Sequence, residues 1–110
     1  MEQLYFKVLI ISILCIISSN AQYHPPIQNF PPDMYKAGNQ NWNISKDDYN
    51  RTYVANNFGL LEFDGLRWTL HPTPDGSIMR SVFVKNNIVY TGAYMDFGYW
   101  LRNDNGTLAY

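Results

Sequence analysis

The feature that most constrains the fold of this 110-residue chain is an internal repeat with a period of about 40 residues. Three pairs of segments share residue types and positions between the two halves: residues 52–56 with 89–93, 58–59 with 97–98, and 65–68 with 106–110. A four-stranded unit of roughly this length is the period of a β-propeller blade. A β-meander within a sandwich is the alternative that the repeat leaves open.

Alternating large and polar residues within each repeat predict short strands. Turn residues such as Asp64-Gly65, Pro74-Asp75-Gly76 and Asn86-Asn87 separate them. We predict strands over residues 42–46, 52–56, 60–63, 68–71, 79–84, 88–92, 98–102 and 108–110. The predicted fold class is therefore all-β, with one four-stranded propeller blade over residues 42–76 and a second, incomplete blade over residues 77–110.

A propeller blade packs both faces against neighbouring blades, and closed rings have at least about four of them. We therefore expect the two units to be a fragment of a larger propeller. The aromatic side chains expected in the core between blades are Trp42, Tyr53, Trp68, Tyr90 and Trp100. An isolated pair would leave outer faces open at residues such as Trp42, Tyr53, Val82 and Tyr90, so we expect it to self-associate.

Residues 1–21 have the pattern of a secretory signal peptide. Lys7 ends a short polar region, and the apolar run over residues 8–17 is too short to cross a bilayer comfortably. Ser19 and Ala21 place small residues before a cleavage site between Ala21 and Gln22. This pattern predicts a periplasmic or secreted protein, and a buried N-terminal strand or helix is the alternative.

Residues 22–41 form a proline-rich lead-in. Pro25, Pro26, Pro31 and Pro32 are expected to prevent regular helix or sheet hydrogen bonding. We expect this arm either to run extended over a surface or to be a disordered mature N-terminus.

Composition argues against several classes of function. A formal net charge of −1 disfavours electrostatic binding of nucleic acid. The single cysteine excludes an internal disulfide, and His24 and His71 have no metal-ligand spacing and are expected to be solvated. Glu62 is expected to face solvent or to pair with an arginine. We predict no catalytic residues, no metal, no cofactor and no enzyme activity in this segment.

Four strings carry a family resemblance: GNQNW (38–42), NNFGLLEFDG (56–65), RS (80–81) and YTGAYMDFGYW (90–100). They resemble the N-terminal end of the two-component-regulator propeller family. More narrowly, they resemble exported sensors with a triple-tyrosine domain and a LuxR-type helix-turn-helix or hybrid histidine-kinase output. One departure is Met95-Asp96, where the family tends to carry a glutamate.

The resemblance implies a periplasmic ligand-sensing segment of a bacterial signal-transduction regulator. In that architecture the remaining blades, a transmembrane helix and an intracellular output follow in a longer chain. A secreted carbohydrate-binding or adhesion module, or a fragment of a propeller enzyme, remains as an alternative.

Arg80, Tyr94 and Asp96 are the candidate ligand-binding residues. In the predicted blades, Tyr94 and Asp96 lie in the loop that joins the second and third strands, and Arg80 sits at the start of an inner strand. A tyrosine beside an arginine and an aspartate can stack on a sugar ring and bind its hydroxyls, which makes a glycan or another small molecule the expected ligand. A purely structural role for the three residues is the alternative.

The signal-peptide pattern predicts export with cleavage between Ala21 and Gln22. Mass spectrometry of the exported product should therefore find Gln22 at the N-terminus, either free or cyclised. A soluble cytoplasmic product that retains Met1 would contradict this prediction.

Overall fold

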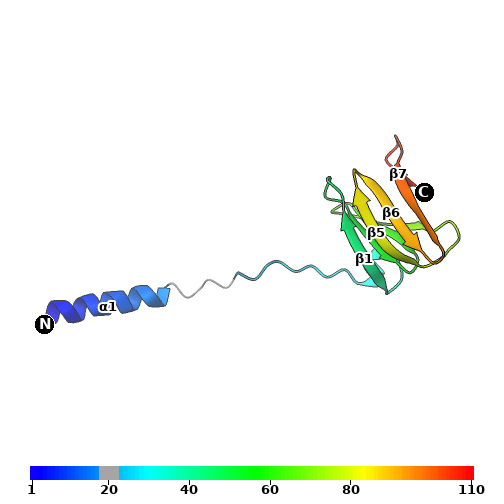
Figure 1. The fold of residues 1–110 in the computed structure, drawn as a ribbon. Coiled ribbons are helices and arrows are strands. Elements are labelled where there is room, and N and C mark those ends of the chain that lie inside the picture. Colours follow the sequence, from blue (N-terminus) through cyan, green and yellow to red (C-terminus); the bar gives the residue numbers. More distant parts are fainter. Residues whose placement is uncertain (18–22) are drawn as a thin grey trace.

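The computed structural model describes residues 1–17 and 23–110. Within them, two helices precede two four-stranded antiparallel sheets, each with its strands in sequence order (Figure 1). The helices are α1 (Glu2–Ile17) and α2 (Pro32–Tyr35). The first sheet contains β1 (Asn41–Lys46), β2 (Thr52–Asn56), β3 (Gly59–Phe63) and β4 (Trp68–Pro72). The second sheet contains β5 (Met79–Lys85), β6 (Ile88–Ala93), β7 (Asp96–Arg102) and β8 (Leu108–Ala109).

The sheet prediction is confirmed in its coarse form, because each predicted strand is present within two residues of its predicted ends. The turns have the backbone that the sequence indicates. Asn86 and Asn87 both adopt positive φ, at 51° and 60°, in the two-residue turn between β5 and β6. Asparagine tolerates this left-handed conformation, which matches the twist of the flanking strands.

Strand pairing corrects the alignment of the two repeats. Asn56 pairs with Gly59 around one two-residue turn, and Ala93 pairs with Asp96 around the other. Gly59 is therefore the structural counterpart of Asp96, 37 positions later, and the alignment of Phe58-Gly59 with Phe97-Gly98 is wrong by two residues. Shared Phe-Gly letters favoured a register that the hairpins do not adopt.

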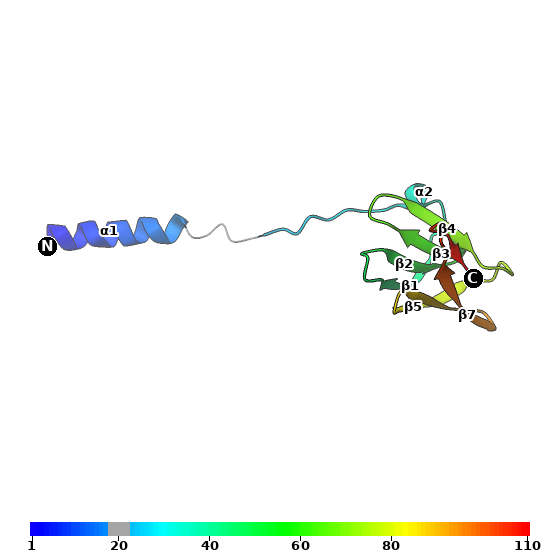
Figure 2. The same ribbon diagram turned by 90° about the horizontal axis from the view of Figure 1, so that it is seen from above.

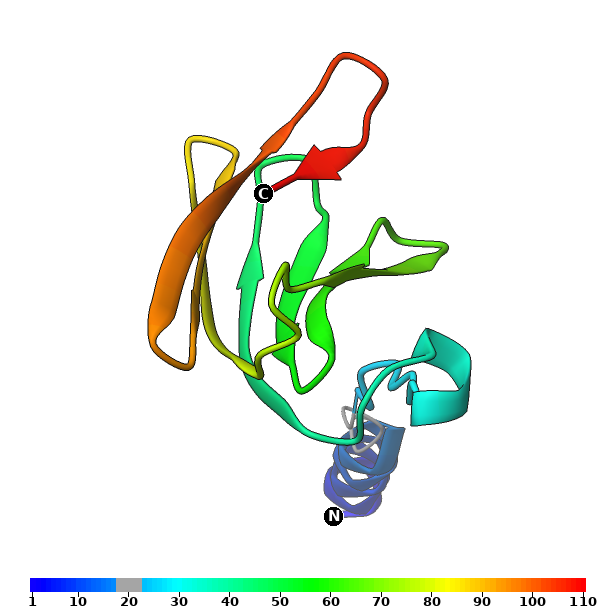
Figure 3. The ribbon, with the colours of Figure 1, turned by 90° about the vertical axis from the view of Figure 1, so that its right-hand side faces the viewer.

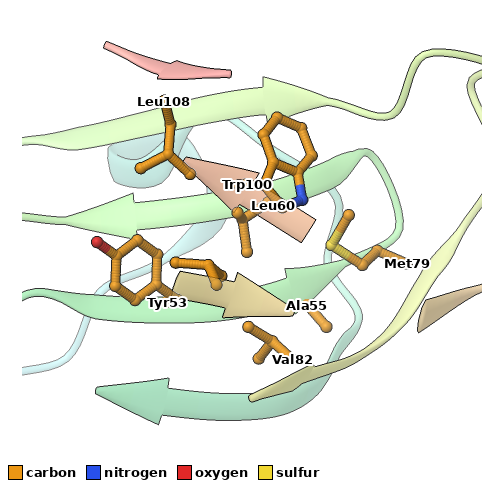
Figure 4. Close-up of a cluster of buried hydrophobic side chains, with 8 residues drawn as sticks. Tyr53, Ala55, Leu60, Met79, Val82, Trp100 and Leu108 are labelled. Carbon is orange, nitrogen blue, oxygen red and sulfur yellow. The ribbon is translucent and has the colours of Figure 1, made fainter. Parts of the chain in front are cut away.

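The two sheets pack face to face through one hydrophobic core. The first sheet contributes Tyr53, Ala55 and Leu60, and the second contributes Met79, Val82, Val89, Trp100 and Leu108 (Figure 4). The first strands of the two sheets, β1 and β5, lie side by side, and the Val84 amide donates to Ser45 Oγ at 3.0 Å. Burial of this cluster is the main apolar contribution to holding the sheets together.

The predicted aromatic core is correct in part. Tyr53, Val82 and Trp100 are buried between the sheets, so the expectation that Tyr53 and Val82 lie on open outer faces is wrong. Trp42 and Tyr90 are exposed, so neither belongs to the core between these two sheets, and both are exposed as expected for an isolated pair of sheets. Trp68 is partly buried, but on the opposite face of the first sheet. Strand alternation gives the two faces of a strand and does not identify which face meets the neighbouring sheet.

The lead-in segment covers that opposite face. Phe30 packs on Phe63 and Trp68, with ring centroids 5.1 and 5.3 Å apart, and Tyr35 is buried against Val54 and Leu61. The short helix α2 lies beside β4, on the far side of the first sheet from the second (Figures 2 and 3). The expectation that proline excludes helix here is wrong, because Pro32 occupies the first turn, where its missing N–H is not needed.

The outward face of the second sheet carries exposed aromatic and apolar side chains. They are Phe83, Tyr90, Phe97, Tyr99 and Leu101. Through the corrected alignment, Tyr90 is the counterpart of Tyr53, and Phe97 is the counterpart of Leu60. Tyr53 and Leu60 are 1% and 0% exposed in the interface, whereas Tyr90 and Phe97 are 42% and 88% exposed. The face that buries the first sheet against the second is therefore open in its repeated copy.

Helix α1 consists mostly of apolar residues and lies apart from the sheets (Figure 1). No helix among the described residues has the length and hydrophobicity needed to span a membrane. The predicted cleavage site after Ala21 lies outside the described residues.

The open face predicts self-association of residues 22–110. In size-exclusion chromatography this segment should elute larger than a monomer, and the Phe97→Ser/Tyr99→Ser double variant should shift toward the monomer because it removes exposed aromatic surface. Phe58→Ser, which alters an exposed phenylalanine in a turn, is the control and should elute like the parent. A monomeric parent with cooperative thermal unfolding would contradict this prediction.

Candidate functional site

The predicted site residues lie at the end of the second sheet that carries the β6–β7 turn. Met79 pairs with Ala93, and Ala93 pairs with Asp96. Arg80 follows Met79, and Tyr94 lies in the turn between Ala93 and Asp96. The expectation that Asp96 lies in this loop is wrong, because Asp96 is the first residue of β7 and pairs with Ala93. The fold therefore brings all three residues to one end of the strands.

Arg80 is positioned by a β-bulge. The β5–β6 register shifts between Met79 and Ser81, so Arg80 stands out of the regular ladder. The β1–β2 register shifts in the same way between Asn41 and Asn43, which sets Trp42 apart. The two bulge residues meet, since the Arg80 guanidinium carbon lies 4.2 Å from the centre of the Trp42 ring, a cation–π contact between the two sheets.

The Trp42 indole is fixed from its edge as well as from its face. Its Nε1 donates to Asn57 Oδ1 at 2.8 Å, and Asn57 Nδ2 donates to Gln40 Oε1 at 3.0 Å. The Asn57 amide also donates to the Gln40 carbonyl at 3.2 Å. An exposed aromatic ring is thus held in a defined orientation beside a cation, an arrangement suited to contacting a ligand.

Asp96 and Tyr94 face different surroundings from Arg80. Asp96 Oδ2 accepts a hydrogen bond from Tyr110 Oη at 3.2 Å. Asp96 also lines a shallow pocket of about 460 Å³ whose wall includes Tyr99 and Tyr110. Tyr94 is exposed at the tip of the turn.

The structure places the three predicted residues at one end, but no pocket described here is lined by all of them. Sequence reasoning missed Trp42 and Tyr110 as neighbours of this end. The available signal was the matching position of Trp42 and Arg80 in the two repeats. A bulge changes the side-chain alternation of a strand, so the pattern alone assigned Trp42 to the core.

A second group of polar residues lies between the sheets, some buried and some partly buried. Glu62 Oε1 accepts a hydrogen bond from Arg102 Nη2 of the second sheet, and Glu62 Oε2 is 2.8 Å from His71 Nε2. Arg102 Nη2 also donates to Tyr53 Oη at 3.0 Å, and Tyr53 Oη donates to Asp47 Oδ2 at 3.0 Å. This polar cluster, formed by Asp47, Tyr53, Glu62, His71 and Arg102, joins the two sheets.

Expectations from the sequence concern two residues of this polar cluster, Glu62 and His71. Glu62 pairs with an arginine, as one of the two expected outcomes, and it does so while buried. The expectation that His71 is solvated is wrong, because its side chain is only 12% exposed and is bonded to Glu62. His71 pairs across β3–β4 with Leu60, which turns it toward the interface between the sheets.

The electrostatics of the cluster follow from these contacts. Burial acts to raise the pKa of Glu62, but its bonds with His71 and Arg102 outweigh burial, so the pKa of Glu62 is lowered from its ordinary value. The pKa of Asp47 is lowered in the same sense, because bonds from Arg51 and Tyr53 outweigh its burial. Both carboxylates are therefore held ionised, and both Glu62 oxygens are occupied by protein groups. This environment suits a structural role better than proton transfer.

Among the described residues, no group of three or more His, Cys, Asp or Glu side chains is arranged to hold a metal ion. The polar cluster contains one histidine and two carboxylates, but Glu62 is bonded to His71 and Arg102, and Asp47 is bonded to Arg51 and Tyr53.

No protein-family model matches the chain, and no curated protein or solved structure matches it significantly.

Glu62→Gln tests the polar cluster. A group whose pKa is lowered by folding stabilises the folded state above its unfolded pKa of about 4.3, and that stabilisation is lost as pH falls through the folded pKa. At pH 7 the variant should lower the free energy of unfolding by about 1–3 kcal/mol, since Arg102 loses its charged partner. Between pH 7 and pH 3, denaturant unfolding should vary less with pH in the variant than in the parent.

The control for Glu62→Gln is Asp48→Asn, which removes an exposed carboxylate outside the cluster. Equal pH profiles for the parent and Glu62→Gln would contradict a stabilising role for the buried ion pair.

Proposed function

We propose that the two sheets are consecutive blades of a propeller that senses a ligand in the periplasm, as part of a two-component regulator. The observation that carries the proposal is the repetition of one packing face. The first sheet buries Tyr53 and Leu60 against the second, and the second sheet presents their counterparts Tyr90 and Phe97 outward. Such head-to-tail repetition suits a ring of blades better than a two-sheet sandwich, in which the outward face would be solvated and mostly polar.

The position of the first strands also supports a propeller. β1 and β5 lie side by side and are linked by the bond from the Val84 amide to Ser45 Oγ. In a propeller the four-stranded blades are arranged around a central channel, so equivalent strands of neighbouring blades lie near one another. Phe30 and Tyr35 partly cover the face of the first sheet that points away from the second sheet. The two outer faces of the pair of sheets therefore differ, because the outer face of the second sheet is open.

Ligand binding is proposed at the end that carries Arg80, Tyr94 and Asp96. The supporting geometry is the Arg80–Trp42 contact, the exposed ring of Tyr94 and the Asp96 carboxylate at the same end of the strands. Aromatic rings and hydrogen-bonding groups in this combination suit a sugar or another small polar ligand. We propose a sensing role without catalysis, because Arg80 is held by the Trp42 ring and the Asp96 carboxylate is bonded to Tyr110.

The proposal predicts that Arg80→Ala, Tyr94→Ala and Asp96→Asn weaken ligand binding. Calorimetric titration of the full chain with neutral hexasaccharides of glucose, xylose and mannose should detect binding to the parent. Each variant should bind about tenfold more weakly, which corresponds to about 1.4 kcal/mol. His24→Ala, in the proline-rich arm, is the control and should bind like the parent. If all three variants also bind like the parent, this end of the sheets is not the site.

A further inference from the structure

A groove of about 680 Å³, whose lining mixes polar residues with the apolar residues Ile88 and Leu101, lies between the two sheets at the end opposite Arg80, Tyr94 and Asp96. This end carries the β1–β2, β3–β4, β5–β6 and β7–β8 connections. The first sheet contributes Tyr49, Arg51 and Asp64 to the groove. Across from them, the second sheet contributes Asn86, Asn87 and Asn103. The volume falls within the range of about 300–1,000 Å³ that is usual for small-molecule sites.

Buried carboxylates fix the positions of the two arginines in the lining of the groove. Arg51 Nε donates to the buried Asp47 carboxylate at 2.7 Å, and Arg51 lies 5.1 Å from the centre of the Tyr49 ring. Arg102, also in the groove lining, is paired with the buried Glu62. Both arginines are therefore neutralised by buried carboxylates, and their positions are set before any ligand arrives. Such preorganisation lowers the entropic cost of binding.

Several polar atoms of the groove remain available to a ligand. The side chains of Asn86 and Asn87 make no hydrogen bond within the described part of the chain. Asn103 uses Oδ1 to accept from the Thr107 amide, which leaves its NH₂ group as a donor. Asp64 uses Oδ1 to accept from the Leu66 and Arg67 amides, which leaves Oδ2 as an acceptor.

We propose that this groove binds a neutral saccharide. The exposed ring of Tyr49 offers an apolar surface for the C–H groups of a sugar, while the asparagine amides and Asp64 can donate to and accept from its hydroxyls. Asp64 is the one charged group of the lining without an ion-pair partner, so the groove disfavours an anionic ligand. The ligand would contact both sheets, and the site stands independently of the one proposed at the opposite end.

The experiment is calorimetric titration of the full chain with cellohexaose, xylohexaose and mannohexaose, and with hexagalacturonate as the anionic comparison. Tyr49→Ala should weaken binding of the preferred neutral sugar about tenfold, and Tyr49→Phe should retain binding within about twofold because the ring remains. Asn87→Gly removes one amide while allowing the positive φ of the turn, and should weaken binding about threefold to tenfold. Tyr23→Ala, which alters an exposed tyrosine in the arm, is the control and should bind like the parent.

Loss of binding in Tyr49→Ala and Asn87→Gly, with retention in Tyr49→Phe and Tyr23→Ala, supports the groove. Absence of binding to all three neutral sugars, stronger binding of hexagalacturonate, or unchanged binding in Tyr49→Ala overturns it. Binding that is lost in Arg80→Ala and Asp96→Asn but unchanged in Tyr49→Ala overturns the groove and supports the site at the opposite end. The reverse pattern supports the groove and contradicts the site at the opposite end, and two binding events in the parent, each lost in one set of variants, support both sites.

Discussion

The ion pair between Glu62 and Arg102 is the contact on which the arrangement of the two sheets depends most. It joins β3 of the first sheet to β7 of the second, next to the apolar cluster of Tyr53, Leu60 and Trp100. Apolar contacts alone tolerate small shifts between packed sheets. A carboxylate with both oxygens bonded, to Arg102 and to His71, does not tolerate such shifts without leaving a buried charge unpaired.

The cost of burying these charges explains how many partners they have. Arg102 is bonded to Glu62, Tyr53 and the Gly106 carbonyl. Tyr53 in turn donates to Asp47, which is also bonded to Arg51. Because a buried ion pair often adds little net stability compared with apolar residues, we attribute its main effect to fixing the register of the two sheets. The same network positions Arg51 and Arg102 in the lining of the groove between the sheets. The packing of the two sheets therefore affects the shape of the groove.

The strands were predictable because their residues obey local rules. The alternation along residues 52–56 and 88–93, and the Asn86-Asn87 turn, fix strand position with no knowledge of the partner sheet. Contacts between sheets were not predictable in this way. The bulges that bring Arg80 onto Trp42 interrupt the alternation, and the burial of His71 depends on Glu62, nine residues away, and on the second sheet. The packing of Phe30 on Trp68 likewise joins segments that no periodic pattern connects.

The two repeats differ at the position that carries the ion pair, and this difference limits what can cover the open face. Glu62 pairs with Tyr53 across β2–β3, and the equivalent cross-strand pair in the second sheet is Tyr90 with Tyr99. A further sheet packed on this face would therefore meet a tyrosine where Arg102 meets a carboxylate. An arginine placed there would find no carboxylate at this position. The phenol hydroxyls still need hydrogen-bond partners when buried, so a well-matched surface would be mostly apolar, with polar groups aligned to Tyr90 and Tyr99.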